Sequence, residues 1–177
     1  MTSLKVLVSG FAVGVIFCCG FGVGVRADAT KVAFPSDYAK GIKWLVVDKQ
    51  PEKQVREVYA PPEAVAAARK GDAMPDGTAI TLVRYSAKLD AQGVPVKDET
   101  GRLIKGEVLG INVMQKGKGW GAEYPEDLRN GEWEYRAFKA DQSPNDQAKL
   151  AGCFQCHKAQ AQEDFIYAYD SLKAAAE

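Results

Sequence analysis

The chain has 177 residues, 46% of them apolar, with 23 basic side chains, 23 acidic side chains and one histidine. This length and composition fit one globular domain with a buried core, and they exclude a disordered tail, a collagen-like fibre and a multi-domain array. The balanced charge argues against a nucleic-acid-binding protein, and the single histidine excludes any site that needs two imidazoles.

The first 27 residues predict a secretory signal. A basic residue precedes an uncharged run over residues 6–25, and Val25 and Ala27 are small residues at the positions that a signal peptidase reads. The run is also long enough to cross a bilayer, so an uncleaved anchor is the alternative. Cleavage removes the two cysteines of the run and leaves residues 28–177 as one mildly acidic exported domain, with no stable membrane insertion.

Strand patterns dominate the middle of the chain. Apolar and polar residues alternate there, and β-branched and aromatic side chains are frequent. Two turn clusters, at residues 90–93 and 98–101, predict hairpin tips that project from a sheet. The fold class expected is therefore α+β and mainly β, with a single antiparallel sheet of about five or six strands and short flanking helices. The clearest strands are expected at residues 42–47, 54–60, 79–85, 107–115 and 132–138.

Three short helices are expected at residues 64–70, 148–152 and 169–175. Two prolines precede the first helix and Gly71 ends it, a common arrangement at helix ends. Ser143 or Asn145 is expected to cap the second helix, which leads into a cysteine motif.

Residues 153–157 read Cys-Phe-Gln-Cys-His, the spacing that attaches a c-type haem covalently. On a helical turn, the Cys153 and Cys156 thiols add to two vinyl groups of one porphyrin, and His157 offers a nitrogen to the iron. The alternatives are a disulfide, a redox-active dithiol and a zinc site. The zinc site needs further ligands, and no other Cys or His remains after cleavage. The expected cofactor is one covalently attached haem c, covered by strands.

Four features carry a family resemblance: Asp76-Gly77-Thr78 before a strand, Trp133 in Gly131-Glu-Trp133, the haem motif, and residues 163–167 with Tyr169. Through these features the chain resembles the cytochrome P-460 and cytochrome c′-beta group. The resemblance extends roughly from residue 38 to residue 174. The resemblance implies a mostly β, homodimeric, periplasmic protein with one haem held on the sheet. It also implies a reduced iron with five ligands.

The resemblance also points to individual site residues. Cytochrome P-460 enzymes cross-link a strand lysine to the porphyrin and use a carboxylate on the next long strand for proton transfer. Those positions fall on Leu82 and Asn112, which have neither an amine nor a carboxylate. Arg56 matches an arginine on the distal side of the haem in this group. Phe165, behind the motif, is expected to press against the proximal face.

The leading hypothesis is thus a periplasmic haem protein whose apolar distal pocket binds small diatomic ligands such as nitric oxide, with His157 on the iron. A P-460-type oxidoreductase acting on hydroxylamine or nitric oxide is the first alternative, so enzymatic activity stays undecided. The second is a plain electron carrier that uses Met114 as a sixth ligand and a redox protein as partner. Arg84 shares a strand face with Leu82 and is a further pocket candidate.

Overall fold

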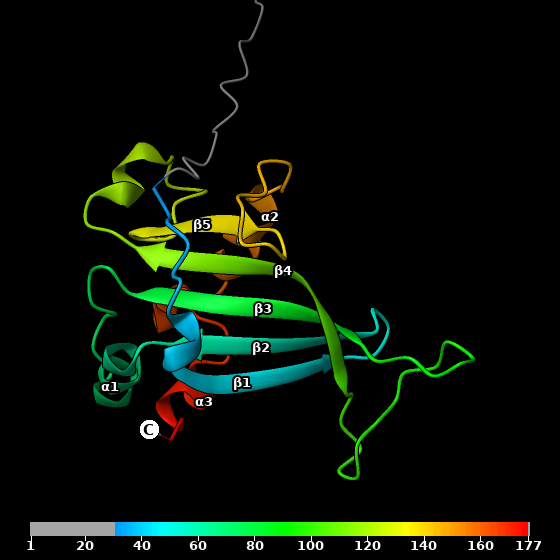
Figure 1. Cartoon of the computed structure of the whole chain (residues 1–177). Coiled ribbons are helices and arrows are strands. Elements are labelled where there is room, and N and C mark those ends of the chain that lie inside the picture. The colour runs from blue at the N-terminus through cyan, green and yellow to red at the C-terminus, as the bar shows by residue number, and fades with distance from the viewer. Residues whose placement is uncertain (1–30, 177) are drawn as a thin grey trace, which may run out of the picture.

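The computed structural model describes residues 31–176, so the predicted signal over residues 1–27 lies outside the described part. Five strands form one antiparallel sheet in the order β1-β2-β3-β4-β5, and each strand pairs with its neighbours along the chain (Figure 1). The predicted fold class is confirmed, and every predicted strand overlaps an observed one. The strands are β1 (Ile42–Lys49), β2 (Gln54–Ala60), β3 (Ala79–Ala87), β4 (Lys105–Lys116) and β5 (Trp133–Phe138).

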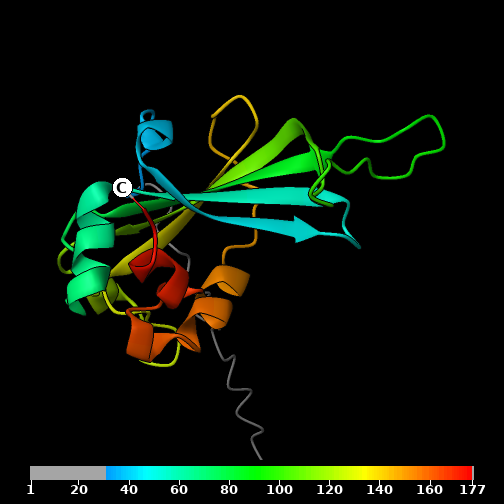
Figure 2. The ribbon, with the colours of Figure 1, turned by 90° about the horizontal axis from the view of Figure 1, so that it is seen from below.

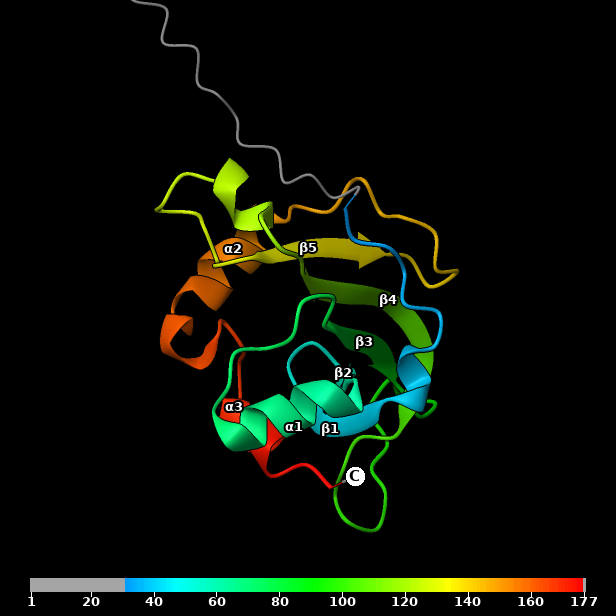
Figure 3. The ribbon, with the colours of Figure 1, turned by 90° about the vertical axis from the view of Figure 1, so that its left-hand side faces the viewer.

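Short helices flank the sheet. The helix α1 ends at Gly71, whose φ of 74° is left-handed and free of strain for glycine, as the sequence pattern predicts. Figures 1 and 3 show α1 beside α3 near the β1 edge of the sheet, whereas α2 lies beside β5. The α-helices are α1 (Pro62–Lys70), α2 (Ala151–Lys158) and α3 (Tyr169–Lys173), and the 3-10 helices are η1 (Tyr38–Lys40), η2 (Trp120–Glu123) and η3 (Ala161–Glu163).

The second helix differs from the prediction. It begins at Ala151, with Leu150 as its N-cap and no side-chain capping bond, so residues 148–150 lie outside it. The two predicted caps are engaged elsewhere. The backbone N–H of Asn145 donates to the carbonyl of Ala137 at 2.9 Å, and the backbone carbonyl of Ser143 accepts from the backbone N–H of Lys139 at 2.9 Å. Pairing beyond the end of β5 therefore keeps this segment extended and delays the helix.

The two faces of the sheet have different coverings. We call the face that packs against α1, α2 and α3 the helical face, because its Val58, Ile80, Met114 and Tyr135 side chains form one core with those helices. The opposite face is covered by η1 and the segment before it (Figure 2). Successive side chains of a strand point to opposite faces, so the alternating patterns decide which residues meet the helices.

A long hairpin between β3 and β4 projects from the sheet (Figure 1). Isolated bridges join Leu89 to Pro95 and Lys97 to Leu103. The Asp90 and Asp98 carboxylates accept backbone amide bonds at the two predicted tips. The end of the sheet next to this hairpin has no helix beneath it (Figure 2). Among residues 31–176, no helix is long and apolar enough to span a membrane.

Candidate functional site

The cysteine-histidine motif lies on α2. Cys153 and Cys156 are therefore separated by one helical turn, as the sequence predicts, and both are free thiols. Cys153 is half-buried beside the core of the helical face, and burial raises the pKa of its thiol, whereas Cys156 is exposed. In residues 31–176, no three His, Cys, Asp or Glu side chains gather as a metal cluster.

His157 is oriented by a main-chain hydrogen bond. Its Nδ1 lies 2.6 Å from the carbonyl oxygen of Phe165. Because a carbonyl oxygen only accepts, Nδ1 carries the proton and Nε2 keeps a free lone pair. Burial lowers the pKa of His157, although the Phe165 carbonyl opposes this shift. The imidazole is thus held neutral, which is the form that ligates a metal.

Two tyrosines flank the imidazole. The ring centroid of His157 lies 5.1 Å from that of Tyr135 on β5 and 5.2 Å from that of Tyr167. The Tyr167 ring meets the imidazole edge-on. Asn130 donates to the Tyr135 hydroxyl at 2.8 Å and to the Phe154 carbonyl at 3.0 Å, which ties α2 to the sheet. His157 is therefore held between a strand and the segment that follows α2.

The turn behind the motif is fastened by one carboxylate. Asp164 and Phe165 have φ values of 48° and 63°, in the left-handed region that side chains rarely adopt. The Asp164 carboxylate accepts from Trp133 Nε1 at 3.1 Å, from the Met74 amide at 2.9 Å and from Lys116 Nζ at 2.7 Å. These three bonds hold the turn whose carbonyl orients His157. Asp164 thus acts on His157 through Phe165, without touching it.

Phe165 contributes its backbone to His157, and its ring lies against Gly131. A Cβ at Gly131 would come within 3.0 Å of ring atom Cε2, so a side chain there would require the ring to shift. The expected contact of this ring with a porphyrin stays a prediction. Lys116 is absent from the predicted site residues, because a lysine at the end of a strand is normally solvated and carries no signal of such a role.

Strand register brings the predicted distal residues onto one face. Leu82 on β3 is the Cα partner of Val58 on β2 and of Asn112 on β4. Two residues back along β3, Ile80 pairs with Met114, which in turn pairs with Tyr135. Leu82 and Asn112 thus lie side by side on the helical face, one step along the strands from the row that contacts His157.

Arg56 and Arg84 form the next row on the same face. They are Cα partners across β2 and β3. The Nε atoms of both side chains are buried and have no hydrogen-bond partner in the part of the chain that the structure describes. No ion pair recorded within residues 31–176 includes either arginine. The helical face therefore carries two guanidinium groups beside its apolar part.

The residues present fit a haem. Two free thiols and a neutral imidazole occupy one stretch of α2, and partly buried apolar side chains extend the core of the helical face around them. Leu82, Trp44 and Leu45 keep accessible apolar surface there, which a flat aromatic macrocycle would cover. This donor set, two sulfurs and one nitrogen, suits covalent attachment with one axial ligand.

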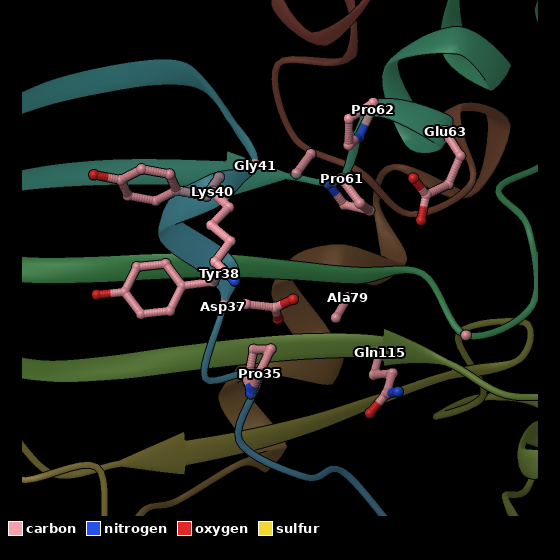
Figure 4. Close-up of a pocket in the computed structure, with 13 residues that line it drawn as sticks. Pro35, Asp37, Tyr38, Lys40, Gly41, Pro61, Pro62, Glu63, Ala79 and Gln115 are labelled. Atoms are coloured by element: carbon pink, nitrogen blue, oxygen red, sulfur yellow. The ribbon is translucent and has the colours of Figure 1, made fainter.

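A separate pocket of about 440 Å³ lies between η1 and the start of α1 (Figure 4). Tyr38, Lys40, Pro61 and Gln115 are among the residues that line it. None of the predicted site residues lines this pocket, and its Gln115 and Tyr59 side chains belong to the face opposite His157. It is therefore distinct from the haem-motif site.

The comparisons with known proteins agree with the haem motif. A family model described as Cytochrome P460 matches residues 35–168, which include all five strands and α2. The match does not distinguish the P-460 branch from the c′-beta branch. A search of curated proteins found no match.

Proposed function

The chain belongs to the cytochrome P460 family, and we propose from this that it is an exported monohaem protein that binds nitric oxide. Membership of the family makes it a haem-iron cytochrome. In our proposal, Cys153 and Cys156 hold the haem covalently as haem c, and His157 Nε2 ligates the iron. Bound haem supplies an iron centre with an open position for a small ligand.

The chain's own residues prepare that centre. The Phe165 carbonyl keeps the proton of His157 on Nδ1, which leaves Nε2 as the donor nitrogen and increases its basicity. The Tyr135 and Tyr167 rings limit rotation of the imidazole. Around the motif, the partly buried apolar side chains exclude water and favour an uncharged diatomic ligand over water or hydroxide.

One observation supports ligand binding over hydroxylamine oxidation. Leu82 and Asn112 are Cα partners on the helical face, at the positions where the P-460 enzymes that this chain resembles have a lysine and a carboxylate. Leucine has no amine to bond to a porphyrin, and an amide is not a proton acceptor at neutral pH. The pair therefore lacks both groups that the enzyme branch uses.

An optical and mass-spectrometric experiment tests this proposal. We expect the reduced holoprotein to have five-coordinate iron, to change its spectrum on addition of nitric oxide, and to have the mass of the chain plus one haem. Peptides that contain β3 should carry no porphyrin after proteolysis. An amine bond between a lysine and the porphyrin would support the oxidoreductase instead. A six-coordinate low-spin spectrum without added ligand would support the electron carrier with Met114 as ligand.

Location and assembly complete the proposal. We propose a chain cleaved after Ala27, as the signal pattern predicts, that is periplasmic and homodimeric, as the family resemblance implies. N-terminal sequencing of the protein purified from the periplasm should begin at Asp28. Light scattering after size-exclusion chromatography should give twice the mass of the holoprotein chain. A retained leader or a monomer at micromolar concentration contradicts the respective part.

A further inference from the structure

We propose that Arg56 and Arg84 together form a binding site for a planar oxyanion on the helical face. The oxyanion has two possible sources: a carboxylate of a haem propionate, or a free anion such as nitrite. The first source rests on the proposed haem, whereas the second does not. Both present two coplanar oxygens, and this shared chemistry is what a pair of guanidinium groups recognises.

The two guanidinium groups repel each other electrostatically. Arg56 and Arg84 lie directly opposite each other on neighbouring strands. Like charges in such cross-strand pairs are destabilising, and an arginine stays protonated at any ordinary pH. A bound anion removes this repulsion. The pair thus has a built-in affinity for negative charge.

No carboxylate of the described chain fills that role. Glu57, the neighbour of Arg56, points to the opposite face and is engaged by Lys43, Lys105 and Tyr59. The recorded ion pairs of residues 31–176 leave both arginines out. The countercharge must therefore come from outside this part of the polypeptide.

Both arginine side chains leave a hydrogen bond unmade within residues 31–176. Both Nε atoms are buried and have no acceptor among the described residues. A buried charged donor without a partner costs free energy, so such groups in folded proteins are normally satisfied. The Arg84 guanidinium lies over Gly110, where a Cβ would come within 2.8 Å of its Nη2 atom. The strand β4 therefore leaves space for this guanidinium on the helical face.

The arginine pair lies on the same face of the sheet as the row beside His157. Arg84 is four residues along β3 from Ile80, whose row ends at Tyr135 beside His157. At about 3.3 Å per residue, the pair lies about 13 Å along the strand from that row. The helices leave this end of the face uncovered (Figure 2). Both arginines are half-buried, and the pair lies on the side of the sheet that His157 faces.

The test compares Arg56→Gln and Arg84→Gln with Arg136→Gln. The control loses the same charge from the same sheet, but Arg136 lies on β5 and bonds the Val32 carbonyl on the opposite face. In the first arm, resonance Raman spectra of the holoproteins report the propionate bending bands. In the second arm, formate and nitrite are titrated calorimetrically into the reduced, carbon monoxide-bound holoproteins, in which the iron position is blocked.

A propionate source predicts shifted propionate bands in both test variants and unchanged bands in the control. A free-anion source predicts that both test variants weaken formate or nitrite binding at least about tenfold while the control binds as the wild type does. Unchanged bands together with unchanged anion affinity in both test variants overturn the proposal. Circular dichroism checks that each variant folds. The loss of one of two like charges that face each other is not expected to impair folding.

A further variant tests whether planar recognition or charge alone matters. Arg84→Lys keeps the charge but loses the forked donor geometry, so it is expected to fall between the wild type and Arg84→Gln. If Arg84→Lys has the propionate bands and the anion affinity of the wild type, the proposed recognition by two forked guanidinium groups is overturned. If the wild-type chain carries no haem, the formate titration still tests the arginine pair, so failure of the haem proposal is recognised separately.

Discussion

The anchoring role of Asp164 leads to a quantitative prediction about the turn behind the haem motif. Asp164→Ala removes the acceptor of three donors: the Trp133 indole, the Met74 amide and the Lys116 ammonium. Trp133 is fully buried, so its N–H would lose its only recorded acceptor within residues 31–176. The side chains of Lys116 and Asp164 are only 14% and 19% exposed, so this ion pair is stronger than a surface pair.

The magnitude follows from these contacts. Breaking one side of a largely buried ion pair costs about 3 kcal/mol or more, and an orphaned buried donor costs about 1–3 kcal/mol. Since the pair keeps some contact with solvent, we expect Asp164→Ala to lower the free energy of unfolding by about 3 kcal/mol. Asp164→Asn keeps one acceptor oxygen and tolerates the left-handed backbone, so its loss is expected to be about 1–2 kcal/mol.

Urea denaturation followed by tryptophan fluorescence measures both losses. The matched control is Asp141→Ala, because Asp141 is exposed and its carboxylate accepts from the amide and hydroxyl of Ser143 in a turn. We expect the control to lose less than about 1 kcal/mol. In the reduced holoprotein, Asp164→Ala should also lower the iron–histidine stretching frequency, because the Phe165 carbonyl no longer holds Nδ1. Equal losses for Asp164→Ala and Asp141→Ala would refute the anchoring role.

Three further predictions concern the acidic network, the first helix and the motif. Burial alone raises the pKa of Glu57, but hydrogen bonds from Lys105, Tyr59 and Lys43 outweigh it and hold the pKa at about 2, below its ordinary value of 4.5. Its stabilisation, on the order of 2–3 kcal/mol, should be present above pH 4.5 and be lost as the pH falls toward 2, and Glu57→Gln should flatten this part of the stability curve. Gly71→Ala should lower the free energy of unfolding by about 1 kcal/mol because of the left-handed φ, whereas Gly71→Asn should lower it by less. Cys153→Ser with Cys156→Ser should abolish haem staining on denaturing gels, and a covalent haem in that double variant would contradict thioether attachment.

The edges of the predicted elements show where local signals stop being sufficient. Gly71 ends α1 as predicted, because the left-handed stop depends only on the residue itself and its immediate neighbours. The caps predicted at Ser143 and Asn145 are wrong, because both residues bond along the extension of β5 instead. A cap preference of about 1 kcal/mol does not outweigh backbone pairing with a strand that is already in place.

The amino-acid sequence alone determined the five strands, the projecting hairpin and the helical turn that carries Cys153, Cys156 and His157. These features follow from side-chain periodicity and turn chemistry, which act between residues a few positions apart. Only the tertiary structure decided that Arg84 faces Arg56, that Lys116 reaches Asp164, and that the Phe165 carbonyl orients His157. The physical reason is that strand register and the packing of α2 bring these groups together. Their separation along the chain does not predict their distance in the fold.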